Sequence, residues 1–226
     1  MDEYLKRILK LLFGLILYAF GLVLSINANI GLAPWDTFNV GISQVTDISI
    51  GNASILIGIL ILIIVVGFLK EKIGIGTILN TTLIGIFMDI IQSFNFIPYM
   101  TNFFLGILML LAGQFIVSLA TYFYISTGFG CGPRDSLMVA LGKKFPNIPI
   151  GAIRGTIEAV VLLIGWSLGA KIGLGTVIAV FGMGFILQNT FRLFHFEIRT
   201  VVHQSIFETI AVFKDITINK EKAINK

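Results

Sequence analysis

The sequence predicts an all-α protein, a polytopic bundle of helices that crosses a membrane several times and consists of two related halves. Of the 226 residues, 56% are hydrophobic and 12% are charged, and the mean hydropathy is +0.96. A soluble domain carries about 25% charged residues, so the apolar surface of this chain indicates a lipid environment. This prediction also rests on long uncharged runs between short polar segments and on a motif that occurs twice.

Three crossings are predicted in the first half of the chain. They cover residues 8–28, 52–69 and 77–94. The first run could also be a secretory signal peptide, but it is long for one, and Ile26-Asn27-Ala28 is a poor cleavage site. A further helix over residues 35–44 has about three turns, which is roughly half the thickness of a bilayer at 1.5 Å per residue.

The second half repeats this order of elements. Its crossings cover residues 102–125, 151–169 and 176–191, with a short helix over 134–142. The chain therefore divides into a first membrane repeat, a second membrane repeat and a cytoplasmic tail, at residues 1–101, 102–192 and 193–226. The tail mixes apolar and charged residues. It is expected either as an amphipathic helix on the membrane surface with a basic end, or as a solvated tail with some helix.

The two halves are related by a constant offset of 99 residues. Gly31-Leu32-Ala33-Pro34-Trp35-Asp36 returns as Gly130-Cys131-Gly132-Pro133-Arg134-Asp135. Gly74-Ile75-Gly76-Thr77 returns as Gly173-Leu174-Gly175-Thr176. One offset that runs through proline, aspartate and a Gly-x-Gly-Thr pattern indicates an internal duplication.

Membrane topology follows from the duplication and the charges. With three full crossings in each half, the second half is inverted relative to the first. If the N-terminus is inside, Lys171 is the only one of the 16 Lys and Arg residues that lies outside, as the positive-inside rule requires. The predicted fold is therefore six crossings as a 3+3 inverted repeat, with both termini cytoplasmic and a short re-entrant or surface helix in each half.

The two Pro-x-Asp motifs form the candidate binding site. Each places proline at the first helical position and a carboxylate, Asp36 or Asp135, near the positive end of a helix. The plain alternative is that both carboxylates only cap short helices. In the functional interpretation, the two helix starts approach the bilayer centre from opposite faces, as in inverted-repeat transporters. Trp35 and Arg134 then form an aromatic wall opposite a cationic donor.

Glu158 is the second candidate for the site. It lies four residues after Arg154 and therefore on the same helix face. It either forms a local ion pair there or acts as a coupling carboxylate near the second motif. Gln114, which also lies inside a predicted crossing, is interpreted as a residue that hydrogen-bonds between helices.

Other function classes have no sequence motif to support them. His195 and His203 lack partner ligands, Cys131 is the only cysteine, and no nucleotide-binding or nucleophile motif occurs. We therefore expect no enzyme activity, metal ion or cofactor. The basic residues are confined to short loops and the tail, which gives no face for nucleic acid. The expected partners are the lipid bilayer and a small solute or ion.

The motif residues resemble the YczE-like family of bacterial integral membrane proteins, which is grouped with the YitT and YyaS proteins. The resemblance is carried by Gly31–Asp36, Val40–Ser43, Ile50-Gly51 and Gly74–Thr77, and it covers about residues 8–200. Family members often have glycine before the motif proline, where this chain has Ala33. The resemblance implies a small polytopic protein of the bacterial cytoplasmic membrane, and it carries over no binding residue.

The function that the sequence favours is a multi-pass transporter or permease for a small solute or ion. Two alternatives remain. One is a membrane scaffold or assembly factor that transports nothing. The other is a lipid-handling protein in which the region around Arg134 meets lipid head groups.

Overall fold

The computed structural model describes residues 2–196, 201, 204–206 and 208–209. The regular secondary structure of this part of the chain is all helical, with eight α-helices and one short π-helical segment. In chain order these are α1 (Asp2–Asn27), α2 (Pro34–Thr46), α3 (Ile50–Ile63), η1 (Ile64–Phe68), α4 (Ile75–Ser93), α5 (Phe103–Ile125), α6 (Pro133–Lys144), α7 (Ile150–Ser167) and α8 (Leu174–Leu193).

Every predicted helix is present, with its ends shifted by a few residues. The largest shift is in α1, which begins at Asp2 instead of residue 8. Lysine and arginine are good helix formers, so the basic start continues the helix. Arg7 also fixes this turn, because its Nε donates a hydrogen bond to the carbonyl oxygen of Thr127 at 2.9 Å. The helix predicted over residues 52–69 ends in the wider π-helical segment η1.

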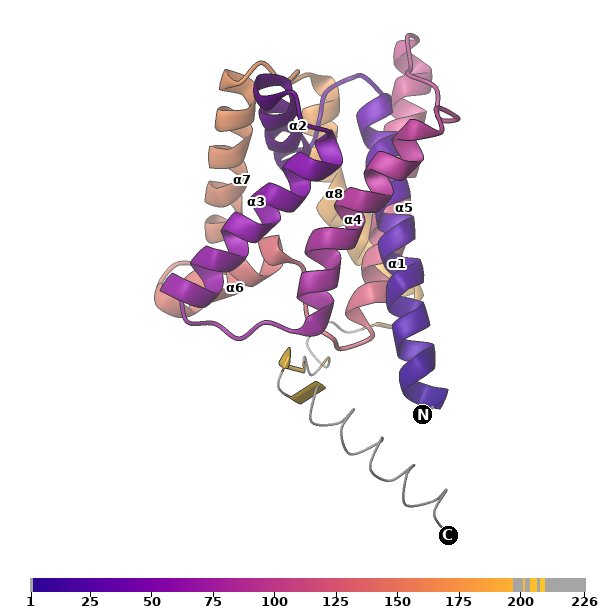
Figure 1. Cartoon of the computed structure of the whole chain (residues 1–226). Coiled ribbons are helices and arrows are strands. Elements are labelled where there is room, and N and C mark those ends of the chain that lie inside the picture. Colours follow the sequence, from indigo (N-terminus) through magenta and orange to yellow (C-terminus); the bar gives the residue numbers. More distant parts are fainter. Residues whose placement is uncertain (1, 197–200, 202–203, 207, 210–226) are drawn as a thin grey trace.

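Five helices are long and apolar enough to span a membrane, namely α1, α3 with η1, α4, α5 and α8. The protein is therefore a helical membrane protein. α7 is not one of these five. It has 18 residues and carries Arg154 and Glu158, and at 1.5 Å per residue it is about 27 Å long. It stands upright beside the other long helices in Figure 1.

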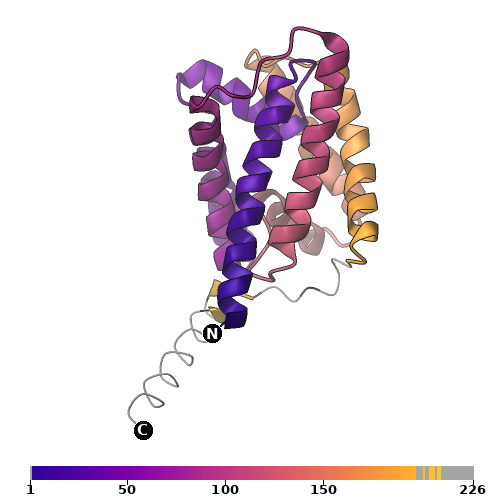
Figure 2. The same ribbon diagram turned by 90° about the vertical axis from the view of Figure 1, so that its right-hand side faces the viewer.

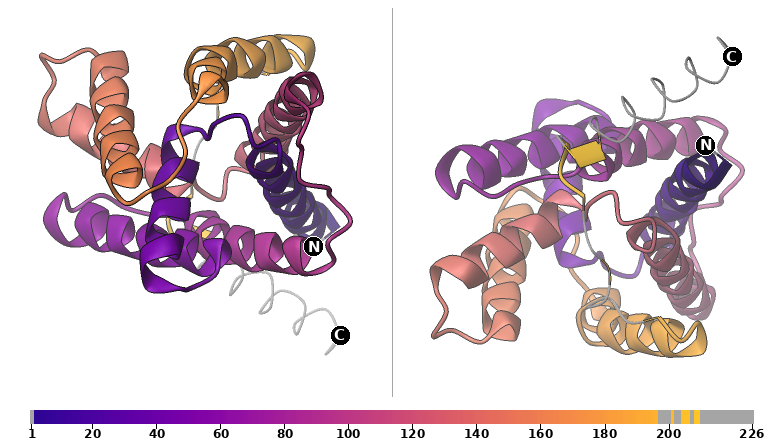
Figure 3. Two further views of the ribbon diagram at one scale, coloured as in Figure 1. Left: turned by 90° about the horizontal axis from the view of Figure 1, so that it is seen from above. Right: turned by 90° about the horizontal axis from the view of Figure 1, so that it is seen from below.

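The two short helices lie at opposite ends of the bundle. Figures 1 and 2 show α2 at the end remote from the N-terminus, whereas α6 lies at the same end as the N-terminus. α2 packs mainly against α7 and α3, and α6 packs against α3 and α7. The view along the bundle in Figure 3 shows α2 in the middle of the ring of long helices.

The bundle is held together where glycines let backbones approach. α1 packs along α5, and a Cβ added at Gly21 would lie 2.8 Å from the carbonyl oxygen of Gly113. α2 packs on α7 in the same way, since a Cβ at Gly41 would lie 2.8 Å from the carbonyl oxygen of Gly165. Small residues at helix interfaces are the usual means of association in lipid, where no hydrophobic force draws helices together.

Close packing is present between α3 and α4 but not between α7 and α8. Gly51 of α3 faces Gly85 of α4, and a Cβ at Gly58 would lie 2.5 Å from Thr81 Cγ2. At an offset of 99 residues, Ile157 and Val180 stand in place of Gly58 and Thr81.

Each motif loop docks on the start of a long helix from the other half. The N–H of Gly76 donates to the carbonyl oxygen of Phe129 at 2.8 Å, and the N–H of Gly175 donates to that of Ile30 at 2.8 Å. Adding the 99-residue offset to Ile30 and Gly76 gives Phe129 and Gly175, so the two bonds occupy equivalent places in the two halves. The Gly-x-Gly-Thr segments that the sequence pairs are therefore the docking sites of the two motif loops.

The described part of the tail contacts the end of the bundle near the N-terminus. The N–H of Gln204 donates to the carbonyl oxygen of Gly128 at 2.8 Å, and the N–H of Ile206 donates to that of Ile73 at 3.1 Å. The predicted amphipathic helix of the tail lies largely outside the described residues.

Candidate functional site

Four of the five predicted site residues line one cavity inside the bundle. Trp35 and Asp36 come from α2, Arg134 from α6 and Glu158 from α7. The cavity has a volume of about 110 Å³, and residues of α1, α5 and α8 complete its lining. We call it the central cavity. Residues 99 apart in sequence thus contribute to one space, as the functional interpretation of the motifs requires.

Two buried polar side chains of the central cavity lack hydrogen-bond partners. Asp36 is 3% exposed, and its Oδ1 has no partner among the described residues. Gln114 of α5 is 4% exposed, and neither its Oε1 nor its Nε2 has a partner there. A buried polar group without a partner costs about 1–3 kcal/mol. Such groups around a cavity indicate a place where a ligand completes the hydrogen bonding.

The charges of the central cavity are of both signs. The guanidinium carbon of Arg134 lies 4.9 Å from the centre of the Trp35 ring, which is within the range of a cation–π contact. Among the described residues, the two ion pairs involve neither Arg134 nor Asp36. The cavity therefore has a carboxylate acceptor, a guanidinium donor and an amide that can act as either.

Asp135 faces a different space. It lines a cavity of about 500 Å³ at the end of the bundle where the N-terminus lies. We call this the end cavity. Tyr124 Oη donates to Asp135 Oδ2 at 3.4 Å, so Asp135 has a partner in the bundle that Asp36 lacks. The two predicted aspartates therefore line different cavities, Asp36 the central cavity and Asp135 the end cavity.

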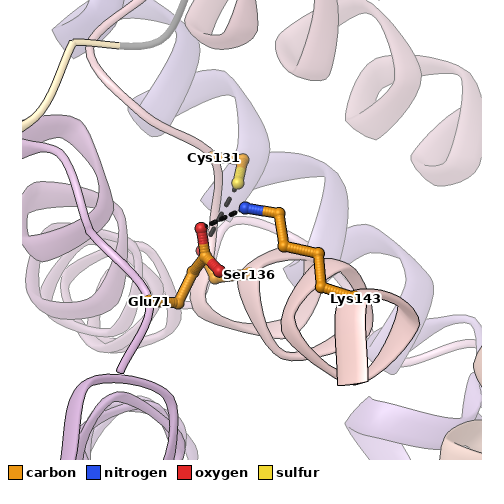
Figure 4. Close-up of polar contacts among 4 residues, drawn as sticks. All are labelled: Glu71, Cys131, Ser136 and Lys143. Atoms are coloured by element: carbon orange, nitrogen blue, oxygen red, sulfur yellow. Dashed lines mark hydrogen bonds and ion pairs between the residues drawn. The ribbon is translucent and has the colours of Figure 1, made fainter. Parts of the chain in front are cut away.

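Figure 4 shows part of the wall of the end cavity. Lys143 Nζ of α6 lies 2.5 Å from Glu71 Oε1 of the loop before α4. Cys131 Sγ and Ser136 Oγ lie 3.3 Å apart, which joins the second motif loop to the first turn of α6. The first contact joins the last turn of α6 to the loop before α4.

An ion pair on α7 joins the linings of the two cavities. On α7, Arg154 lines the end cavity and Glu158 the central cavity, and Arg154 Nε donates to Glu158 Oε1 at 2.8 Å. The predicted local pair is confirmed. Along α5, Gln114 and Val117 line the central cavity, and Thr121 one turn later lines the end cavity. The cavities therefore lie in line along the same helices.

The structure also corrects the interpretation of the polar residues that surround the motifs. Gln114 does not hydrogen-bond between helices, because its amide faces the central cavity without a partner among the described residues. The alternative that Asp36 caps α2 is not observed, since α2 begins without a side-chain cap. Asn39, one turn after Asp36, was not singled out by the sequence. It is fully buried, and its amide has no partner in the described part of the chain.

Among the described residues, no three His, Cys, Asp or Glu side chains come close enough together to bind one metal ion. The acceptors of the central cavity are one carboxylate without a partner, one amide and the ion-paired Glu158. This set suits a ligand with N–H or O–H donors.

Comparison with known proteins places the chain in a family without an assigned function. Residues 5–192 match a family of unknown function, DUF6198. An uncharacterized membrane protein of Bacillus subtilis, YczE, is 35% identical over 177 residues, which cover 77% of this chain and 80% of that protein. An uncharacterized protein of Haemophilus influenzae is 33% identical over 183 residues, which cover 81% and 82% of the two chains.

A more distant relative is the uncharacterized protein YyaS of Bacillus subtilis, which is 23% identical over 176 residues, or 77% of this chain and 87% of that protein. No solved structure matches the chain. The family match covers most of the chain, including both motifs and all eight helices up to residue 192. The protein is a member of the DUF6198 family and is similar to the membrane protein YczE.

Proposed function

We propose that the protein is a transporter for a small solute or ion, with the central cavity as its binding site. The observation that carries this proposal is the pair of buried acceptors without partners, Asp36 and Gln114, in one cavity with Arg134. A cavity inside a membrane bundle with unpaired polar groups is the usual form of a solute site in transporters. Nothing in the site resembles a nucleophile with its base, so we propose binding and transfer without chemistry.

The proposal includes a membrane topology of six crossings with α7 as the sixth and both termini in the cytoplasm. It is supported by the positions of α2 and α6 at opposite ends of the bundle and by the two exchanged backbone bonds. In this topology the second half is an inverted copy of the first. The end cavity then faces the cytoplasm, and the ion pair of Arg154 and Glu158 lies between residues that line it and residues that line the central cavity.

Transport requires that the central cavity reaches water on each side of the membrane in turn. This is tested by a cysteine at Met183, which lines the central cavity, in a Cys131→Ser background. A membrane-impermeant maleimide is added to intact cells and to inside-out vesicles, and the labelled fraction is measured. We expect labelling from both sides. Labelling from neither side, or from one side only under every condition, would reject transport and favour the scaffold alternative.

Two control positions calibrate the assay. A cysteine at Ala19, which is fully buried in α1, must stay unlabelled from both sides. A cysteine at Val45, which is 61% exposed at the end of α2, must be labelled only from outside in the proposed topology. Labelling of position 45 from the cytoplasmic side alone would reverse the orientation without rejecting the cavity as a site.

A further inference from the structure

We interpret the space between α7 and α8 as an opening of the central cavity toward the membrane. Glu158 of α7 and Val180 and Met183 of α8 all line the cavity, yet the two helices do not pack along each other. The equivalent helices α3 and α4 are closed by glycine contacts. Gly184 of α8 stands in place of Gly85, and no atom lies within 4 Å of a Cβ added there. Close glycine contacts thus hold α3 and α4 together, whereas α7 and α8 lack such contacts.

The surface on both sides of this gap is apolar. Val160, Leu163 and Ile164 on α7 and Val177, Phe181 and Phe185 on α8 are all exposed. Inside the bilayer, such a surface meets acyl chains. A ligand that enters through the gap therefore comes from the lipid phase, and its apolar part remains between the helices while its polar part reaches the cavity.

The polar groups of the cavity specify the head group. Asp36 Oδ1 is a buried acceptor without a partner, and a positively charged N–H donor would form the strongest bond with its carboxylate. Arg134 has its ring contact with Trp35 but takes part in neither ion pair of the described residues, so its N–H groups can bind an oxyanion. A head group with a primary ammonium at one end and a phosphate at the other satisfies both residues, and Gln114 can bond to either end.

We propose that the central cavity receives the head group of a zwitterionic phospholipid of the ethanolamine type, which enters sideways from the bilayer between α7 and α8. This proposal rests on the central cavity as the binding site. It replaces an unspecified solute with an amphiphile, and it assigns the open α7–α8 side as the entrance. A quaternary ammonium has no N–H donor for Asp36, and an anionic head group has no cation for it, so both bind more weakly.

The two tryptophans provide the probe. The Trp166→Phe variant keeps Trp35, which lines the central cavity. The Trp35→Phe variant keeps Trp166, which is 54% exposed on α7 and serves as the matched control. Each variant is placed in nanodiscs of phosphatidylglycerol that contain a fixed fraction of acyl-brominated phosphatidylethanolamine, phosphatidylcholine or phosphatidylglycerol. Bromine quenches tryptophan fluorescence on contact.

We expect brominated phosphatidylethanolamine to quench Trp35 at least twofold more than the other two lipids, whereas Trp166 is quenched equally by all three. Asp36→Asn should remove the preference at Trp35. Gly184→Leu should do the same by filling the gap, whereas Gly67→Leu should not, because Gly67 lies in η1, away from α7 and α8, and has equal space around it. If Gly184→Leu does not fold, Val180→Phe blocks the same gap.

Three results would overturn the proposal. The first is quenching of Trp35 that does not depend on the head group or on Gly184→Leu. The second is a shift of Trp35 emission by water-soluble glycerophosphoethanolamine without quenching by the brominated lipid, which would assign the cavity to a soluble solute. The third is a dimer that dissociates with Gly184→Leu and shields Trp35 from every lipid, which would assign the gap to a second copy. None of these affects the accessibility test at position 183, so the transport proposal stands or falls separately.

Discussion

Arg134 lies over the ring of Trp35, with its guanidinium carbon 4.9 Å from the ring centre. The two residues occupy the same place in motifs that are 99 residues apart, so the contact joins the two short helices α2 and α6 at the central cavity. It also explains why the motif carries an aromatic residue in one half and a cation in the other, because two identical residues at this point could not form a cation–π pair.

Loss of this contact should destabilise the protein and leave α2 and α6 less firmly joined. We expect Arg134→Gln to lower the stability by about 0.5–2 kcal/mol, measured by thermal unfolding in detergent. Arg134→Lys should recover only part of the loss, since lysine lacks the planar guanidinium that stacks on a ring. Arg134→Gln in a Trp35→Leu background should have little further effect, and an undiminished effect there would show that Arg134 acts through another residue.

The polar groups without partners in the central cavity should lower the stability of the protein when no ligand is bound. We expect Gln114→Leu to raise the stability by about 1–3 kcal/mol, because it removes a buried amide without a partner. Thr121→Val is the matched control on the same helix, since the Thr121 hydroxyl donates to the carbonyl oxygen of Val117 at 2.7 Å. Thermal unfolding of both variants measures these changes in stability. Destabilisation by Gln114→Leu would mean that the amide has a structural partner.

The motif glycines should be intolerant of a side chain. Gly31 and Gly130 have φ values of +118° and +117°, and a Cβ at Gly130 would lie 2.6 Å from Thr77 Oγ1. We expect Gly31→Ala and Gly130→Ala each to cost at least about 1–3 kcal/mol. The control is Gly155→Ala in α7, where the space is open and alanine favours the helix by about 1 kcal/mol. Equal unfolding temperatures for Gly130→Ala and Gly155→Ala would contradict the docking role of the loop.

The sequence predicts this architecture well because its signals are local and repeated. Apolar runs locate the long helices, and the constant offset identifies both Pro-x-Asp segments and the Gly-x-Gly-Thr segments on which their loops dock. Side-chain direction at the start of α6 is not predictable in this way. Arg134 and Asp135 are adjacent in sequence but face different cavities, and only the packing of α6 against α3 and α7 decides which way each points.

Gln114 illustrates the other limit of sequence. Polar residues inside apolar helices are usually hydrogen-bonded to a neighbouring helix, and nothing local distinguishes one that faces a cavity. The 99-residue offset pairs Gln114 with Leu15 of α1, so the polar group occurs in one half only. A residue that breaks a repeat at an otherwise apolar position is the signal that would have identified it.

The ion pair of Arg154 and Glu158 should act as a barrier between the two cavities. We expect Glu158→Gln to increase the rate at which a cysteine at Met183 is labelled from the cytoplasmic side by about threefold or more, because the pair loses its charge-assisted bond. The exchanged pair Arg154→Glu with Glu158→Arg should restore slow labelling. An unchanged rate in Glu158→Gln would show that the barrier lies elsewhere, with Tyr124 and Asp135 as the next candidates.

Cys131 should react slowly with thiol reagents in the folded protein, and its reactivity should report the packing of the second motif loop. Burial raises the pKa of the Cys131 thiol, and the hydrogen bond with Ser136 opposes this rise only in part. The thiolate is the reactive form, so a raised pKa leaves less of it at pH 7–8. The labelling rate should increase by about tenfold per pH unit up to the raised pKa, and it should be far higher after unfolding in SDS. Ser136→Ala removes the contact that lowers the pKa, so labelling at a given pH should become slower still. Faster labelling in Ser136→Ala would show instead that the hydroxyl holds the loop closed.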